Sequence, residues 1–276
     1  DGGAFSMTLW VVKIGTSLLR GETATTIDGY ARCFAGAMDR GDQVVLVTSG
    51  AVGLGCQKLA LTNRPDTVVA LQAAAAIGQG ALMALYERAM ERHGRSVAQV
   101  LLTRSDLADR RRYQNASGTL RQLLSWGVLP VINENDALSP AELRFGDNDT
   151  LSALVAAAVE AQQLILLTDV DRLYSSDPRV DANAEPISDV RHPRELDSLE
   201  QGAGDGGRWG TGGMTTKLAA ARIATASGIT VQLADGRDPA RLEALLQGER
   251  GGTVFHPHPE PCLLYTSDAA DEELRV

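Results

Sequence analysis

Short apolar segments recur along the chain, and nearly every one is followed by a stretch of helical character. None of them alternates apolar and polar residues, as a strand with one wet face would. Strands that are buried on both faces and joined through helices are typical of a parallel sheet. The sequence therefore predicts a three-layer α/β/α sandwich around a mostly parallel central sheet. The predicted strands are 9–14, 43–48, 97–102, 128–133, 163–168 and 229–234, and the predicted helices are 27–39, 67–92, 112–126, 149–161 and 213–227.

No repeat or long linker divides the chain. Its 276 residues suffice for one large α/β domain with a sizeable core. We therefore predict a single domain over residues 7–258, with Met7 as the candidate natural start. The glycine-rich stretch "EQGAGDGGRWGTGG" (200–213) is predicted to be a loop, and it is long enough to be functional.

Charge and cysteine content restrict the class of partner. The formal net charge of −9 argues against a nucleic-acid partner, because binding to phosphates needs a basic surface. The three cysteines, Cys33, Cys56 and Cys262, show no ligand spacing and no even count, so we expect a reduced cytoplasmic protein with no metal held by protein ligands.

Two apolar stretches, 67–86 and 151–170, approach the length of a membrane span. Both are rich in alanine and are interrupted by polar residues, among them Gln72, Gln79 and Glu160. Buried helices explain such stretches better than a membrane span does. We therefore expect no membrane association.

The residues just past the predicted strands share one chemistry. In open parallel sheets, ligands bind outside the carboxyl ends of the strands. Here those ends are small, hydroxylated, amidic or acidic: "KIGTS", "TSGAVG", "TRSD", "NEND", "TDVD" and "ADGR". This edge of the sheet is therefore the candidate site.

Two lysines in glycine-rich surroundings suggest a phosphate ligand. Lys13 lies within an apolar strand that leads into a glycine turn, and Lys217 follows the glycine-rich segment 210–213. Thr216 precedes Lys217, so the segment is not a P-loop, and no G-x-G-x-x-G follows the first strand, which disfavours a Rossmann enzyme. Cations, backbone amides and carboxylates together are what phosphoryl transfer requires.

The stretch "RFGDNDTLSALVAAAV" (144–159) places three polar residues in front of an apolar helix. Asp147, Asn148 and Asp149 could each cap the helix, because their side chains accept hydrogen bonds from its free N–H groups. A helix needs only one such cap, so the two additional polar residues indicate a ligand.

Seven segments together carry a resemblance to a known family. They resemble, in the same order, the glutamate 5-kinases, a branch of the amino acid kinase family, and the similarity runs from about residue 9 to residue 256. This resemblance implies transfer of the ATP γ-phosphate to the side-chain carboxylate of L-glutamate, the first step of proline biosynthesis, with Mg²⁺ bridging the phosphates. The segments are "VVKIGTS", "VTSGAVGLG", "LLTRSDL", "VLPVINENDA", "FGDNDTLSALVA", "LLTDVDRLYSSDPR" and "GTGGMTTKLAAARIA".

The resemblance also implies roles for individual residues. Lys13 and Lys217 would neutralise the transferring phosphoryl group, and Asp149 would hold their ammonium groups. The residues expected to bind glutamate, through acidic groups for its ammonium and amides for its carboxylates, are Ser49, Gly50, Asn133, Asp136, Asp147 and Asn148. Those expected to hold ATP are Lys13, Gly15, Thr168, Asp169, Thr211, Gly212, Gly213, Met214, Thr215, Thr216 and Lys217.

The family further implies feedback inhibition by proline, and we expect a homo-oligomer, either a dimer or a tetramer. The loop 137–145 joins two expected glutamate-binding segments and is the candidate place for proline to act. Two alternatives stay open. One is another kinase of the same fold, acting on aspartate, acetylglutamate or a nucleoside monophosphate, and the other is a sensor without turnover.

The C-terminal segment departs from the family pattern. Many members carry a further RNA-binding-like (PUA) domain, which we do not expect here. Residues 259–276 match neither domain, and "CLLYTSDAADE" (262–272) resembles the translation of a transposon-type sequencing adapter. We interpret 259–276 as an artefactual tail. A genuine acidic, disordered tail is the alternative.

Overall fold

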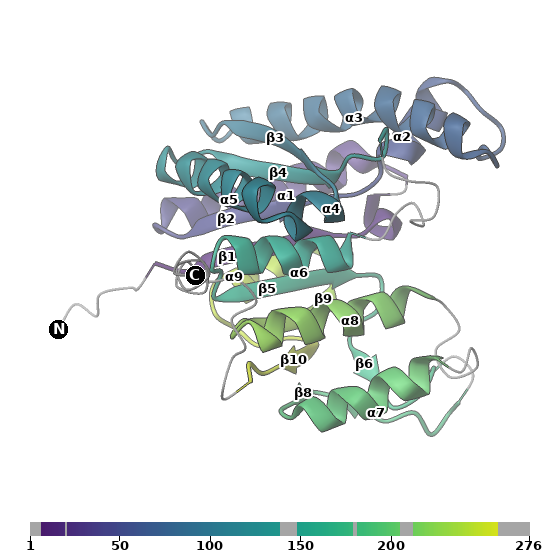
Figure 1. Ribbon diagram of the computed structural model, residues 1–276, viewed down its shortest axis with the longest axis vertical. Helices are drawn as coiled ribbons and strands as arrows, with labels where there is room; N and C mark the ends of the chain where they lie inside the picture. Colours follow the sequence, from purple (N-terminus) through teal and green to yellow (C-terminus); the bar gives the residue numbers. More distant parts are fainter. Residues whose placement is uncertain (1–6, 20, 139–147, 179–180, 205–211, 259–276) are drawn as a thin grey trace, which may run out of the picture.

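The computed structural model describes residues 7–19, 21–138, 148–178, 181–204 and 212–258. Its centre is an eight-stranded sheet in the order β3-β4-β2-β1-β5-β9-β10-β8 (Figure 1). Every neighbouring pair is parallel except β9 and β10. The strands are β1 (Leu9–Ile14), β2 (Gln43–Val47), β3 (Val97–Leu102), β4 (Leu129–Glu134), β5 (Gln163–Thr168), β8 (Asp189–Val190), β9 (Thr230–Asp235) and β10 (Thr253–Phe255), and β6 (Leu173–Tyr174) pairs separately with β7 (Pro186–Ile187).

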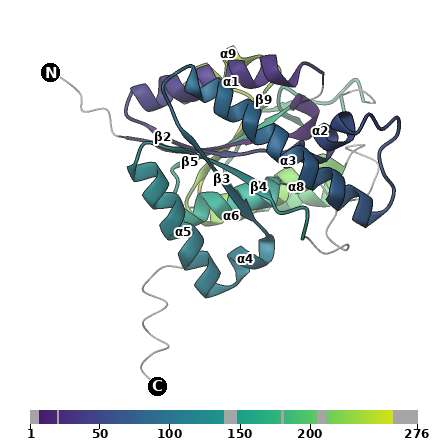
Figure 2. The ribbon, with the colours of Figure 1, turned by 90° about the horizontal axis from the view of Figure 1, so that it is seen from above.

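Helices cover both faces of the sheet (Figure 2). One layer contains α1 (Thr23–Asp39), α3 (Val68–Glu91) and α9 (Pro239–Leu246), and the other contains α5 (Arg110–Ser125), α6 (Asp149–Ala158) and α8 (Gly212–Ala226). The central strand β1 serves both layers, because alternate side chains of a strand point to opposite faces. Leu9 and Val11 pack towards α6 and α8, whereas Trp10, Val12 and Ile14 pack towards α1 and α9.

The remaining helices are short or lie at the margins of the sandwich. They are η1 (Thr16–Leu19), α2 (Ala51–Lys58), α4 (Arg104–Ala108) and α7 (Pro193–Gly204). Helix α2 follows β2 directly and packs along α3. This packing brings α3 close to the edge of the sheet at which β2 ends (Figure 1).

The predicted α/β/α sandwich is confirmed, and the six predicted strands are present to within one residue at each end. The prediction for 200–213 is partly wrong, because α7 continues as a helix to Gly204. Its buried Leu196 anchors it in the core, Gly202 and Gly204 lie in its last turn, and Gly212 and Gly213 begin α8. Residues 205–211 lie outside the described residues.

The prediction of a buried helix over 67–86 holds for one face of α3 and is wrong for the other. Leu82, Tyr86 and Met90 pack in the core, but Val69 is 75% exposed and Ile77 is 39% exposed. Among the described residues, α3 is the one helix that is long and apolar enough to cross a membrane. The core helix of a sandwich meets the same criteria, and α3 forms part of a packed layer here.

Candidate active site

The candidate site lies where the carboxyl ends of β1, β2 and β4 meet the N-terminus of α6. Lys13 comes from β1, Ser49 follows β2, Asn133 belongs to β4, and Asn148 and Asp149 begin α6. Parallel pairing of these strands places their carboxyl ends at one edge. Segments that are far apart in the sequence therefore converge at this edge.

Asp149 holds two lysines that come from different elements. Its Oδ1 lies 2.5 Å from the Nζ of Lys13, and its Oδ2 lies 3.2 Å from the Nζ of Lys217 at the start of α8. The hydroxyl of Thr216 donates a further hydrogen bond to Oδ2, at 2.8 Å. The Lys217 ammonium also donates to the carbonyl of Gly213, at 3.1 Å. The structure thus brings the three expected catalytic residues into direct contact.

The charge state of Asp149 follows from these contacts. Burial alone would raise its pKa, but the ammonium groups of Lys13 and Lys217 and the Thr216 hydroxyl outweigh burial and lower the pKa of this carboxyl. Asp149 is therefore an anion at neutral pH. The Asp149 carboxylate carries one negative charge and the Lys13 and Lys217 ammonium groups carry two positive charges. The cluster therefore has a net positive charge, which suits a phosphoryl group.

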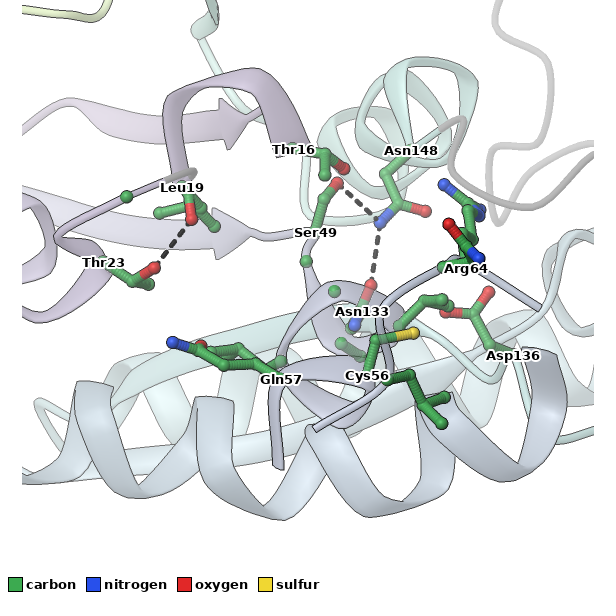
Figure 3. A pocket seen from close by; sticks show the side chains of 18 of the residues that line it. Thr16, Leu19, Thr23, Ser49, Cys56, Gln57, Arg64, Asn133, Asp136 and Asn148 are labelled. Atoms are coloured by element: carbon green, nitrogen blue, oxygen red, sulfur yellow. Dashed lines mark hydrogen bonds between the residues drawn. The ribbon is translucent and has the colours of Figure 1, made fainter. Parts of the chain in front are cut away.

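Asn148 does not cap its helix with its side chain, although it occupies the N-cap position. Its Nδ2 instead donates to the carbonyl of Thr48 at 2.5 Å, to the Oγ of Ser49 at 3.2 Å and to the Oδ1 of Asn133 at 2.8 Å (Figure 3). These contacts connect the start of α6 with the ends of β2 and β4. The capping explanation for this polar stretch therefore fails at Asn148.

The carbonyl oxygen of the Asn148 side chain is buried and has no hydrogen-bond partner among the residues that the structure describes. In Figure 3 it points away from Ser49. A buried polar atom without a partner is costly unless a ligand or water supplies one. Since this atom accepts hydrogen bonds, the partner that fits it is a donor such as an ammonium group.

Five of the six residues expected to bind glutamate line one cavity of about 620 Å³ (Figure 3). They are Ser49, Gly50, Asn133, Asp136 and Asn148, and the sixth, Asp147, lies outside the described residues. Gly50 is the N-cap of α2 and has a positive φ of 102°, which favours glycine. The cavity is therefore bounded by a helix N-terminus, hydroxyl and amide groups, and a carboxylate.

Asp136 is the acidic group of this cavity. Burial and the neighbouring Glu134 raise the pKa of Asp136 to about 6, and Arg64, which also lines the cavity, opposes the shift. An ammonium group bound beside Asp136 would favour its anionic form and reverse the shift. The raised pKa thus fits a group whose natural partner is a cation.

The described residues expected to hold ATP lie at the ends of β1 and β5 and at the start of α8. Gly15 follows β1, and a Cβ built on it would lie 3.6 Å from the Nζ of Lys13. Thr168 is buried at the end of β5, and Asp169 is exposed beside it. The first five residues of α8 are Gly212, Gly213, Met214, Thr215 and Thr216, whereas Thr211 lies outside the described residues.

Two residues near the cavity were not identified from the sequence as site residues. Arg64 comes from the connection between α2 and α3, where no motif marks it. Gln79 lies on α3, and its Oε1 accepts a hydrogen bond from the Nδ2 of Asn133 at 2.8 Å. The signal for Gln79 was visible, because a glutamine in the middle of an alanine-rich apolar helix needs a polar partner.

Comparison with known proteins relates the chain to one family. The sequence pattern of the amino acid kinase family matches residues 8–235. The chain is 98% identical to the glutamate 5-kinase of Synechococcus sp. (strain CC9605) over 255 residues, which cover 92% of this chain and 71% of that protein. It is 74% identical to the glutamate 5-kinase of Prochlorococcus marinus (strain MIT 9313), with 92% of this chain and 72% of that protein covered.

Solved structures show the same fold at low sequence identity. Carbamate kinase from Giardia lamblia bound to AMP-PNP superposes with a TM-score of 0.65 at 18% identity, covering 92% of this chain and 99% of that chain. Isopentenyl phosphate kinase from T. acidophilum, in a product complex, gives a TM-score of 0.61 at 19% identity and covers 90% and 100% of the two chains. These similarities concern the fold.

Proposed function

Because the chain belongs to the amino acid kinase family, and within it to the glutamate 5-kinases, we propose that it transfers the γ-phosphate of ATP to the side-chain carboxylate of L-glutamate. The product is glutamyl 5-phosphate, and the reaction is the first step of proline biosynthesis. The contact of Lys13 and Lys217 with one buried aspartate, next to a polar cavity, is the observation that carries the proposal.

The two lysines act on the group that is transferred. Negative charge is spread over the phosphoryl oxygens during transfer, and cations fixed at that position stabilise the transition state. Asp149 supplies the fixed position, because it contacts both ammonium groups with its two carboxylate oxygens. We assign Lys13 and Lys217 the catalytic role and Asp149 the role of holding them in place.

Glutamate fits the cavity with its ammonium group towards Asp136 and the free carbonyl oxygen of Asn148. This assignment differs from the role that the family resemblance suggested for Asn148, because its Nδ2 is already engaged within the protein. The N-terminus of α2 at Gly50 and the Ser49 hydroxyl suit the α-carboxylate. The side-chain carboxylate then extends towards the lysines.

ATP is the proposed phosphoryl donor, with its phosphates at the N-terminus of α8 and its nucleoside towards Thr168 and Asp169. The N-terminus of a helix suits phosphate, and Lys217 in the second turn of α8 adds a cation. Among the described residues, no group of three or more His, Cys, Asp or Glu side chains converges to hold a metal ion. We therefore propose that Mg²⁺ is held mainly by the phosphates of ATP, as is usual for this ion.

The remaining assignments extend the same proposal. We place the kinase domain at residues 7–258, and the sheet that takes in both β1 and β10 supports this range. Free Cys33 and Cys56 fit a reducing cytoplasmic location.

Proline is the proposed feedback inhibitor, and most of the loop 137–145 lies outside the described residues. The exposed Val69 and Ile77 on α3 support assembly into a dimer or tetramer, which light scattering would measure.

One assay tests the proposed function against its alternatives. ADP release is measured with glutamate, aspartate, acetylglutamate and uridine monophosphate, and hydroxylamine is added to trap an acyl phosphate as the hydroxamate. We expect release and trapping with glutamate alone. Turnover with another acceptor but not with glutamate would identify a different kinase of this fold, and binding without any turnover would identify a sensor.

A further inference from the structure

We propose that Gln79, on helix α3, is a positioning residue for glutamate binding. It acts through Asn133, with which it shares a hydrogen bond at the edge of the cavity. The inference rests on the proposed function, because it concerns the affinity of the same glutamate site. The experiment below distinguishes a failure of this inference from a failure of the proposed function.

Four carboxamides form a chain from the cavity to the surface. Asn148 donates to the Oδ1 of Asn133 at 2.8 Å, and Asn133 donates to the Oε1 of Gln79 at 2.8 Å. Gln79 donates in turn to the Oε1 of Gln99 on β3, at 3.0 Å. The first three amides each use the NH₂ group towards the next carboxamide, and Gln99 accepts the last of these hydrogen bonds.

Within this chain, Asn133 depends on Gln79 as the hydrogen-bond acceptor for its Nδ2. It is buried, and its Oδ1 already accepts from Asn148 and from the backbone N–H of Glu134, the latter at 2.9 Å. Its Nδ2 must therefore find an acceptor, and Gln79 provides one. A buried donor that loses its acceptor is unfavourable, and the side chain turns to satisfy it elsewhere.

The consequence for glutamate follows from the position of Asn148. The free carbonyl oxygen of Asn148 is the atom assigned to the ammonium group, and Asn133 is one of the acceptors that hold the Asn148 amide. A turn of Asn133 would move Asn148 relative to Ser49 and the cavity. Loss of the Gln79 acceptor should therefore weaken glutamate binding and leave the lysine cluster intact.

Helix α3 is held closely enough to give this contact a fixed geometry. A Cβ on Gly78 would lie 1.7 Å from the carbonyl oxygen of Ala51, and a Cβ on Gly55 would lie 1.8 Å from that of Ala74. The backbones of α2 and α3 therefore touch next to Gln79. Gln79 also lines a second cavity, of about 320 Å³, together with Ala51 and Asp136.

The test replaces Gln79 by residues of similar length. Gln79→Met removes the acceptor, and we expect the glutamate KM to rise about tenfold, as for the loss of one buried hydrogen bond, with kcat and the ATP KM within about twofold. Gln79→Glu keeps an acceptor oxygen for Asn133 and should restore the glutamate KM to within about threefold of the parent. Arg88→Met, an exposed change on the same helix, is the matched control and should leave all three constants unchanged.

A double-mutant cycle with Asn133→Ala decides whether Gln79 acts through Asn133. In the Asn133→Ala background, Gln79→Met should change the glutamate KM by less than about twofold, because the shared contact is already absent. An additive effect, or an unchanged KM for the single variant with an active parent, would overturn the inference. A parent that fails to phosphorylate glutamate would instead overturn the proposed function. If Gln79→Met does not fold, Gln79→Ala makes the same comparison.

Discussion

Lys13 and Asp149 form an ion pair that is almost completely removed from water: the Nζ and Oδ1 atoms lie 2.5 Å apart, and the two side chains are 4% and 3% exposed. A buried ion pair is weak evidence for stability, because desolvation of the charges can exceed their attraction. Here the carboxylate also contacts Lys217, so it brings together two cations that would otherwise repel each other. This arrangement is better explained by the chemistry of the site than by the stability of the fold.

Lys217→Ala tests the catalytic assignment without disturbing the buried pair. We expect kcat to fall by about 10²-fold or more, with the glutamate KM within a few fold, because the charge of Lys217 matters most in the transition state. Steady-state kinetics on both substrates provides the measurement. Lys58→Ala, at the exposed end of α2, is the control and should be silent. A near-normal kcat in Lys217→Ala would remove the lysine from the catalytic role.

Asp136 predicts how glutamate binding depends on pH. Its pKa is raised to about 6, so the carboxyl becomes neutral as the pH falls through that value and loses its attraction for an ammonium group. The glutamate KM should therefore rise as the pH falls from about 7.5 to about 5.5, a range that includes this pKa. In Asp136→Asn the KM should be high at every pH. A parental KM that stays flat over this interval would place the ammonium group elsewhere.

The raised pKa of Asp136 also makes the stability of the folded protein depend on pH. The pKa of Asp136 is higher in the folded protein than the value of 3.8 for an unperturbed carboxyl, so the folded state binds more protons between pH 3.8 and about 6. The contribution of Asp136 to stability therefore falls as the pH rises through that window. Asp149 contributes in the opposite direction: its pKa is lowered, and its contribution is lost as the pH falls through its folded value.

Gly78→Ala tests the contact between α2 and α3. The added Cβ would lie 1.7 Å from the carbonyl oxygen of Ala51, so the helices must separate. We expect Tm to fall by several degrees, as for a core change of about 2 kcal/mol, and the glutamate KM to rise because α2 lines the cavity. Gly80→Ala on the same helix meets nothing within 4 Å and should leave Tm unchanged or higher. Equal melting temperatures for the two variants would contradict the close packing.

Much of the fold was predictable because it depends on local patterns. The six apolar strands and the polar residues at their ends follow from burial on both faces and from the rule that ligands bind at the carboxyl edge. The strand order was not predictable, since it depends on contacts such as those of β1 with β2 and β5, which are far apart in sequence. The short strands β8 and β10 also escaped prediction, because two or three residues carry too little pattern.

The sequence predicted which residues form the candidate site better than it predicted the contacts that they make. The motifs named Asn148 and Asp149, but only the structure shows that the NH₂ group of Asn148 is used internally. The burial of Lys13 and Asp149 is likewise visible only in the structure. Replacing Asp149 by asparagine should therefore lower the stability, because a buried cation without its partner is strongly destabilising.

Asp149→Asn is the change that tests the central claim most directly. Asparagine keeps the shape of the side chain and removes the one negative charge that holds Lys13 and Lys217. Circular dichroism and a thermal melt locate a temperature at which the variant is folded, and kcat is measured there for variant and parent. We expect a lower Tm and, in the folded variant, a kcat lower by at least about 10²-fold, because a misplacement of about 1 Å costs that much. A folded Asp149→Asn enzyme that keeps more than about a third of the parental kcat would contradict the claim that this carboxylate positions the two lysines for phosphoryl transfer.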